Sequence, residues 1–431
     1  MIFLKKGGRD PEISWELAGP DEVDFPAYHR QFLDRVELDG RRIARITLLG
    51  GLTIKARIFI DATYEGDLMA KAGVSYRIGR ESNQVYNETL NGVQVRDLHQ
   101  FSHPVDPFVE PGNPASGTLP HVNPADAGPN GRGDHRIQAY CFRMCMTDSP
   151  ELRIPWEKPA QFDLQEYFLA SRWFKGKKNQ YNELILPNDE LRKFDRLEPA
   201  PHKTDTNNHG PFSSDFIGAN YAWPESDYPQ REHLYQQHVN YQKGLYWFLA
   251  NDPSIPARYR ERIGSFGLAK DEFEETGHWP SQLYIREARR MIGDYVPTEN
   301  DCMHRKFCDD PVGIGSYTVD SHNCQRFLRD GRVLNDGDVQ VPPAGPYGVS
   351  YRSIVPRKGE CENLAVPVCC SASHIAYGSV RMEPVFMILG ESAAIAADLA
   401  LNDKVALQDL PYSALKPELI KAGQVLEVPE H

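Results

Sequence analysis

The chain has 431 residues, of which 40% are hydrophobic and 25% are charged, and its formal net charge is -12 at pH 7. This length exceeds one ordinary hydrophobic core, and the composition is typical of a loop-rich globular enzyme, which excludes a disordered or fibrous chain. The negative charge repels phosphate backbones and anionic lipids, and no large basic patch offsets it, so we expect neither a nucleic-acid nor a membrane partner.

The N-terminal part predicts a helix, two strands and a second helix. A mildly amphipathic segment from Phe25 to Leu38 indicates the first helix, and two apolar runs, at 42–49 and 53–60, indicate strands that turn at Gly50. The polar turn at 61–67 follows the second strand and leads into the short second helix. We therefore expect this turn to lie at the carboxyl end of a strand.

The middle of the chain, residues 76–280, is heterogeneous. It contains Pro- and Gly-rich loops and two helical candidates, at 162–175 and 229–250. A segment inserted between two strand-turn-helix units usually forms a cap or substrate domain. The polar run at 203–216 suits a pocket loop and an ordinary surface loop equally well, and both interpretations stay open.

The C-terminal part is regular again. A short apolar run at 364–370 indicates a buried strand, and the small-residue-rich segment from Glu383 to Leu401 indicates a helix with Pro384 at its first position. A helix amino end offers free N–H groups and the positive end of a dipole, which suits a pyrophosphate or a reduced flavin. A plain buried helix is the alternative.

Arginines cluster just before this block. Arg286, Arg289 and Arg290 share a predicted helix and could hold a carboxylate or a phosphate. A solvated helix face, or ion pairs with Glu287 and Asp294, is the alternative.

Eight cysteines are present, and none has the C-x2-C spacing of a zinc ribbon or an iron–sulfur ligand set. We therefore expect no metal. Cys369 and Cys370 lie in an apolar run, where buried unpaired thiols are more common than redox partners. The sequence shows no apolar window of about 18 residues and no signal-peptide core at its start, so the chain as given reads as soluble and cytoplasmic.

The run from Tyr347 to Leu401 contains SYRSIVP, ENLAVPVC, SASHIAYGSVRMEP and GESAAIAAD. It resembles the C-terminal signature of the FAD-dependent oxidoreductase family that includes heterodisulfide reductase A-like relatives. The resemblance implies that Arg381 and Pro384 begin a helix beneath the isoalloxazine, with the arginine charge near reduced flavin. A second run, ARIFIDATYEGDLMAKAGV, is similar to a strand-to-turn element of glutathione-reductase-like flavoproteins, with Tyr64 where those proteins usually have Gly.

The resemblance implies FAD as the cofactor and an α/β FAD/NAD(P)-binding fold, a three-layer sandwich with an inserted α+β substrate or cap domain. We expect the FAD-binding domain at 1–75 and 281–401, the inserted region at 76–280 and a tail at 402–431. The implied cofactor-binding residues lie in the turn and in the final block: Asp61, Ala62, Thr63, Gly66, Asp67, Ser373, Gly378, Arg381, Met382, Glu383 and Pro384.

The G-x-G-x-x-G turn that opens dinucleotide-binding folds is missing. Gly128, Gly131 and Gly133 have the spacing G-x-x-G-x-G instead of G-x-G-x-x-G, and the pair Gly313 and Gly315 lacks a third glycine. We therefore expect a chain without the family's first βαβ unit, as a fragment, a truncated gene model or a degenerate member, whose upstream signal peptide could have been lost. Because affinity for FAD depends on that turn, we predict weak or absent FAD binding by this chain alone.

The catalytic candidates are His374, His322 and Asp320. His374 lies just ahead of the flavin-facing helix, and Asp320, Ser321 and His322 are expected to form a compact cluster that orients a substrate hydroxyl. A structural histidine bonded to backbone is the alternative for either imidazole.

The expected function is hydride transfer between flavin and a small polar organic substrate. Four tryptophans among polar loops favour a sugar-like ligand: Trp156, Trp173, Trp223 and Trp247. Two alternatives stay open, a hydrolase or lyase using Asp205, Asp215 and Asp320, and a non-catalytic fragment that needs a partner chain. A homo-oligomer is left open, and the cysteine spacing does not support the iron–sulfur clusters of heterodisulfide reductase relatives.

Overall fold

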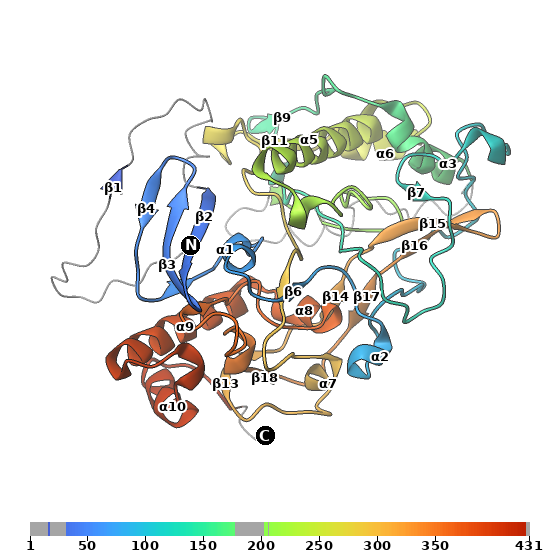
Figure 1. Ribbon diagram of the computed structural model, residues 1–431. Helices are drawn as coiled ribbons and strands as arrows, with labels where there is room; N and C mark the ends of the chain where they lie inside the picture. Colours follow the sequence, from blue (N-terminus) through green and yellow to red (C-terminus); the bar gives the residue numbers. More distant parts are fainter. Residues whose placement is uncertain (1–15, 18–31, 177–201, 206, 428–431) are drawn as a thin grey trace. The chain divides into compact units, whose positions relative to one another are not determined.

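The computed structural model describes residues 16–17, 32–176, 202–205 and 207–427 (Figure 1). These residues belong to two compact units. Unit 1 comprises Met1–Asn91, Glu287–Asp320 and Gln340–His431, and unit 2 comprises Gly92–Arg286 and Ser321–Val339. Two of the four unit boundaries fall within short strands, β14 (Val319–Ser321) and β17 (Val339–Val341).

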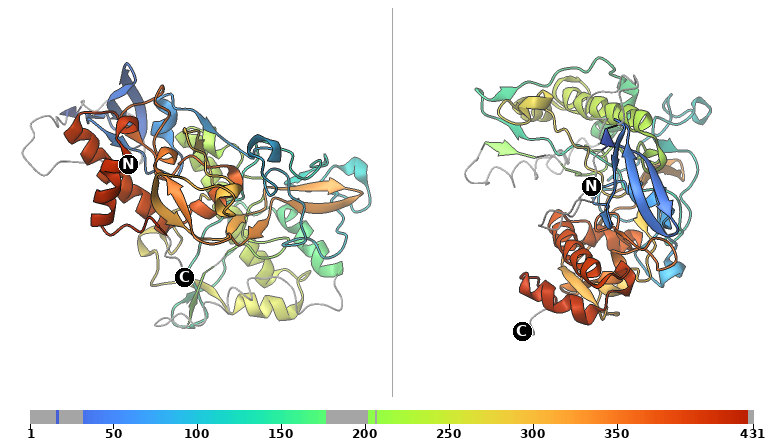
Figure 2. Two further views of the ribbon diagram at one scale, coloured as in Figure 1. Left: turned by 90° about the horizontal axis from the view of Figure 1, so that it is seen from below. Right: turned by 60° about the vertical axis from the view of Figure 1, so that its left-hand side comes forward.

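A four-stranded antiparallel sheet opens unit 1, with the strand order β1-β4-β3-β2 labelled in Figure 1 and the strands drawn in blue in Figure 2. The strands are β1 (Glu16–Leu17), β2 (Leu33–Asp39), β3 (Arg42–Leu48) and β4 (Leu52–Ile54). The prediction of a helix from Phe25 to Leu38 is wrong for the described part, because β2 pairs along its length with β3 and Gly40 closes the hairpin with a left-handed backbone (φ 58°). Residues 25–31 of that prediction lie outside the described residues.

A parallel pair, β5 (Phe59–Ile60) and β19 (Leu364–Ala365), brings the two halves of unit 1 together. The predicted polar turn follows β5 and leads into α1 (Asp67–Lys71), as the sequence indicates. Apolar side chains of the sheet, of the strand pair and of α1 form one buried cluster: Leu33, Ile43, Ile46, Ile54, Phe59, Leu68, Met69, Leu364 and Val366. The turn at 61–67 therefore starts from a rigid core.

Three helices complete the C-terminal part of unit 1: α8 (His374–Val380), α9 (Glu383–Asp403) and α10 (Tyr412–Lys421). Helix α9 packs on β13 (Pro311–Gly315), which pairs with β18 (Tyr347–Ser350). A Cβ on Gly313 would lie 2.5 Å from Ile388, so glycine permits this close approach. Helix α9 begins at Glu383, and Pro384 is its second residue rather than its first.

Helix α9 is also long and apolar enough, by length and composition alone, to cross a membrane, contrary to the expectation that no such segment exists. One helix of this kind is weak evidence, because the core helix of a soluble protein passes the same test. Ser392 of α9 donates to the carbonyl of Val312 in β13 (2.7 Å), and Leu389 and Ala393 are buried. This face of the helix therefore belongs to the core of unit 1.

The segment that carries Arg286, Arg289 and Arg290, predicted as a helix, is extended instead. Its strand β12 (Arg290–Met291) pairs with β6 (Tyr76–Arg77). The remaining short helices of unit 1 are α2 (Asn83–Tyr86) and α7 (Glu299–Cys302). The arginine cluster thus lies on extended backbone, and its members do not share a helix face.

Unit 2 is built around α5 (Tyr228–Asn251), which is preceded in the chain by α3 (Phe168–Gly176) and followed by α6 (Ala257–Gly264). Asp227 accepts a hydrogen bond from the backbone of Gln230 (2.9 Å), which caps the start of α5. The described residues of unit 2 contain two sheets. The first consists of β8 (Met146–Thr147), β9 (Arg153–Ile154), β10 (Lys203–Thr204) and β11 (Gly267–Ala269). The second consists of β7 (Val122–Asn123), β15 (Gln325–Arg329) and β16 (Arg332–Asp336).

The four tryptophans expected to bind a sugar pack inside unit 2. Trp173 and Trp223 are buried, Trp156 stacks on Tyr246, and Trp247 meets the ring of Phe162 edge-on. The tryptophans therefore serve the aromatic core of this unit and do not argue for a carbohydrate ligand.

Candidate functional site

The turn after β5 in unit 1 is held by Asp61. Its buried carboxylate accepts hydrogen bonds from the backbone N–H (3.1 Å) and the hydroxyl (2.6 Å) of Thr63, and from the backbone N–H of Met69 (3.0 Å). Burial raises the pKa of Asp61, and these hydrogen bonds oppose that shift. Asp61 therefore shapes the turn, whereas Ala62, Thr63 and Glu65 keep part of their surface exposed.

Gly66 and Arg289 complete the turn. Gly66 has a left-handed backbone (φ 68°), and a Cβ there would lie 3.1 Å from the Cβ of Cys369. Arg289 donates to the carbonyl of Glu65 (3.0 Å) and to Asp67 (2.7 Å), so the negative charge of Asp67 is already paired.

The turn and the start of α9 meet through an aromatic contact. The ring of Tyr64 lies edge-on to that of Phe386 in the first turn of α9, with 6.1 Å between centroids. Met382 is half-buried, and Glu383 and Pro384 are exposed. Unit 1 therefore brings together two predicted cofactor-binding segments that are more than 300 residues apart in the chain.

Three predicted cofactor residues are buried and already engaged. Ser373 caps α8 and donates to Glu88 (2.6 Å), and a Cβ on Gly378 would lie 2.6 Å from the carbonyl oxygen of Asp320. Arg381 ends α8 instead of starting α9, and its guanidinium lies 3.2 Å from the carboxylate of Asp320. The prediction that Arg381 begins the final helix is wrong, because this ion pair holds its charge at the end of α8.

His374 begins α8 within a buried ionic network of unit 1. Its Nδ1 lies 2.7 Å from Glu287, and its backbone N–H donates to Glu81 (2.9 Å). Arg290 bridges the two glutamates, at 2.8 Å from Glu287 and 2.9 Å from Glu81. Burial raises the pKa of Glu81, but Arg290 and the His374 N–H outweigh burial and lower it to about 2.

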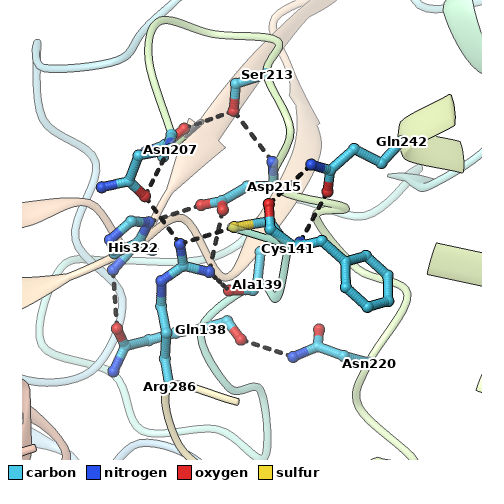
Figure 3. A network of polar contacts seen from close by, with 12 residues as sticks. Gln138, Ala139, Cys141, Asn207, Ser213, Asp215, Asn220, Gln242, Arg286 and His322 are labelled. Atoms are coloured by element: carbon cyan, nitrogen blue, oxygen red, sulfur yellow. Dashed lines mark hydrogen bonds and ion pairs between the residues drawn. The ribbon is translucent and has the colours of Figure 1, made fainter. Parts of the chain in front are cut away.

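Unit 2 contains a second buried network of the same three chemical types (Figure 3). Asp215 lies 2.7 Å from Nδ1 of His322 and 3.1 Å from the guanidinium of Arg286. Burial raises the pKa of Asp215, but the charges of Arg286 and His322 outweigh it, so the net shift is downward. Arg286 also donates to Sγ of Cys141 (3.2 Å) and to Asn207 (3.1 Å).

Side-chain amides tie this network to the backbone of unit 2. Gln242 on α5 both accepts from and donates to the backbone of Phe142 (2.8 Å each), and Gln138 accepts from the N–H of His322 (3.1 Å) (Figure 3). The network therefore joins α5 to the extended segment at 138–142. Gln138 and Gln242 belong to no sequence motif and gain their partners only through folding, so the sequence does not indicate them.

Two groupings expected from the sequence are not formed. His322 binds Asp215, while the neighbouring Asp320 binds Arg381, so the cluster of Asp320, Ser321 and His322 does not act as one group. The three aspartates considered for paired-carboxylate chemistry are each held by a different arginine, with Arg143 holding Asp205 (2.7 Å).

Among the described residues, no three His, Cys, Asp or Glu side chains gather as a metal-ligand set. All eight cysteines are free, and Cys369 and Cys370 are buried, as predicted. Burial raises the pKa of Cys370 to about 12, which keeps this thiol protonated.

Comparison with known proteins gives one match. The family model described as FAD dependent oxidoreductase matches residues 20–419. No curated protein and no solved structure matches the chain. The family match spans nearly the whole sequence, including both segments that resemble flavoproteins. The chain therefore belongs to the FAD-dependent oxidoreductase family, and is an enzyme with an FAD-binding α/β fold that uses FAD as its cofactor.

Proposed function

We propose that this enzyme oxidises or reduces a small polar organic substrate that bears hydroxyl groups, by hydride transfer to or from flavin. The observation that carries the proposal is the buried Glu287–His374 pair at the start of α8, in the unit that holds both flavoprotein-like segments. FAD, when bound, supplies the two-electron redox chemistry.

The residues of unit 1 fit part of an FAD site. Ala62, Thr63, Met382 and Pro384 keep exposed surface on two segments that meet at the Tyr64–Phe386 contact, and these are the residues we propose to hold the cofactor. Asp61 and Gly66 shape the turn without needing to touch a ligand. Glu383 lies in the first turn of α9, where its carboxylate interacts favourably with the helix dipole and opposes a bound anion.

We assign unit 1 to FAD binding and unit 2 to the substrate or cap role. The flavoprotein-like runs at 56–74 and 347–401 both lie in unit 1, whereas the polar run at 203–216 lies in unit 2. The three-layer arrangement and the domain limits expected from the family stay predictions.

His374 is the group we propose to move a proton. Glu287 accepts the hydrogen bond from its Nδ1–H, which leaves Nε2 as the atom able to take or release a proton. The ring is only 2% exposed, so its alternative role is to anchor α8 to Glu81 and Glu287.

Replacement of His374 by Gln tests this role. With a substrate found by screening hydroxyl compounds for loss of the oxidised-flavin absorption, we expect kcat to fall about 10²- to 10⁴-fold with flavin content unchanged. His233→Gln, on the exposed side of α5, is the matched control. Full turnover by the His374 variant with intact flavin binding would remove His374 from the mechanism.

FAD affinity is a separate test. Because the sequence has no G-x-G-x-x-G turn, we propose that this chain alone binds FAD weakly. Stoichiometric FAD retained through gel filtration and visible in the absorption spectrum would show the proposal to be wrong. Co-purification of a second chain with FAD bound would instead favour the alternative of a subunit that needs a partner.

A further inference from the structure

A second carboxylate–histidine pair lies in unit 2, outside the networks described above. Nδ1 of His99 is 2.6 Å from the carboxylate of Asp338, and the two side chains are 12% and 3% exposed. The ring of His209 meets that of His99 edge-on, with 5.8 Å between centroids. The imidazoles thus reach the surface, while the carboxylate behind them is buried.

The hydrogen bonds determine which nitrogen of His99 carries the proton. An ionised carboxylate only accepts, so the short contact to Asp338 places the proton on Nδ1. The amide nitrogen of Asn208 lies 3.1 Å from Nδ1 of His99 and 3.5 Å from the same carboxylate oxygen, and with the proton on Nδ1 it donates to the carboxylate. In the neutral ring, Nε2 of His99 is then the lone-pair acceptor, and no partner of this atom lies among the described residues.

The backbone at His99 has an uncommon conformation that its neighbours maintain. His99 has a left-handed φ of 50°, which a residue with a side chain rarely adopts. Asn335 on β16 donates to the carbonyl of His99 (3.0 Å), and its backbone N–H donates to Gln100 (2.8 Å). Gln100 returns a hydrogen bond to the carbonyl of Asn335 (2.9 Å), so the loop is clamped on both sides.

The same pair is connected to the buried network of Figure 3. The hydroxyl of Ser213 donates to Asn208 (2.7 Å) and accepts from the backbone N–H of Asp215 (3.3 Å). The ion pair between Asp215 and Arg286 therefore fixes the loop that supplies Asn208 and His209. A rigid buried network behind a partly exposed polar group is the arrangement that preorganised binding sites need.

We propose that His99 and His209, with Asp338 and Asn208 behind them, form a binding site for a hydroxyl-bearing small molecule in unit 2. An unprotonated Nε2 needs a hydrogen-bond donor, which a hydroxyl provides. The negative charge of Asp338 disfavours an anion, and the described residues offer no three-ligand set for a metal. This site rests on the proposed function, because it takes the same class of hydroxyl-bearing molecule.

The test uses diethylpyrocarbonate, which acylates unprotonated imidazole, on the full-length protein. Peptide mass spectrometry follows the labelling rate of each histidine with and without D-glucose, D-galactose, myo-inositol and glycerol. At about ten times its Kd, a bound compound slows labelling of His99 and His209 about tenfold. The exposed His233 serves as the internal control and keeps its rate.

The variant Asp338→Asn provides a second measurement. It removes the ionised acceptor that orients the His99 ring, so we expect the protection to weaken while the circular dichroism spectrum stays unchanged. If no compound slows the labelling of His99, the site is overturned. The site is also overturned if His99 is labelled as slowly as the buried His238, because Nε2 would then be inaccessible.

Flavin absorption recorded in the same samples, supplemented with saturating FAD, separates this site from the proposed function. Protection of His99 without flavin reduction by any compound supports the site and contradicts the assigned substrate class. Flavin reduction without protection leaves the substrate class intact and overturns the site. The absence of both effects overturns both proposals.

Discussion

The two buried networks consist of the same three groups but differ in charge balance. In unit 1, Arg290 meets two carboxylates, those of Glu81 and Glu287, whereas in unit 2 Arg286 meets the single carboxylate of Asp215. Each network also binds one histidine. The two arginines are four residues apart in one extended segment, so neighbouring side chains of similar chemistry serve different cores.

The difference shows which ion is indispensable in each unit. Removing one partner of a buried ion pair leaves an uncompensated charge, and the penalty rises with the number of charges left behind. Arg290 is paired with two buried carboxylates, so unit 1 should depend on its arginine more than unit 2 depends on Arg286.

Arg290→Met gives the largest expected effect. It leaves Glu287 buried without this cation and leaves Glu81 with only the longer contact to Arg77 (3.6 Å), and we expect the free energy of unfolding of unit 1 to fall by about 5 kcal/mol. Hydrogen exchange of each unit, recorded at increasing urea concentrations, measures this loss. Arg41→Met is the control, since that side chain is 57% exposed and its pair with Glu362 should contribute about 0–1 kcal/mol. Equal losses in the two variants would contradict the prediction.

Arg286→Met should destabilise unit 2 by about 4 kcal/mol, less than the change at Arg290 because only Asp215 loses its cation and His322 remains bound to it. Hydrogen exchange of the 138–142 segment reports the loss. Arg329→Met, which breaks a solvent-exposed pair with Asp126, is the matched control in the same unit. A larger loss than that of Arg290→Met would reverse the comparison.

Acid should weaken unit 1 through Glu81. Its pKa is lowered from 4.5 to about 2, so its stabilisation is complete above the unfolded-state value and is lost as pH falls toward about 2. We expect a loss of about 3 kcal/mol over this range. Burial raises the pKa of Glu88, so the contribution of Glu88 to the unfolding free energy has the opposite pH dependence: it stabilises the folded state at low pH, and this stabilisation is lost as pH rises.

Glu81→Gln tests this pH dependence. In urea denaturation at a series of pH values, the variant should lack most of the acid slope of the unfolding free energy. A slope identical to that of the unsubstituted protein would assign the acid sensitivity of unit 1 to other carboxylates.

Gly378→Ala gives the smallest expected effect, about 2 kcal/mol of destabilisation, because the new Cβ would lie 2.6 Å from the backbone oxygen of Asp320. Gly390→Ala in α9 has nothing within 4 Å of its Cβ and should be neutral or stabilising. Thermal unfolding compares the melting temperatures of the two variants. A melting temperature unchanged by Gly378→Ala would show that α8 can shift away from β14.

Local patterns predicted some of these elements well. The turn at 61–67 follows an apolar run and precedes a helix, and α5 has a capping aspartate and a proline near its start, so both are readable from neighbouring residues. The helix predicted for Arg286, Arg289 and Arg290 does not form, because long-range pairing of β12 with β6 overrides local helical propensity. The candidate histidines were chosen by position, and their carboxylate partners, 87 and 107 residues away, carry no sequence signal.

The sequence by itself determined the family, the cofactor and the burial of Cys369 and Cys370, because each of these depends on a contiguous run of residues. Only the tertiary structure decided that Arg381 binds Asp320, that His322 binds Asp215 and that His99 binds Asp338. A buried charge must find a partner wherever the folded chain brings one, and the spacing of residues along the chain does not encode which one it meets.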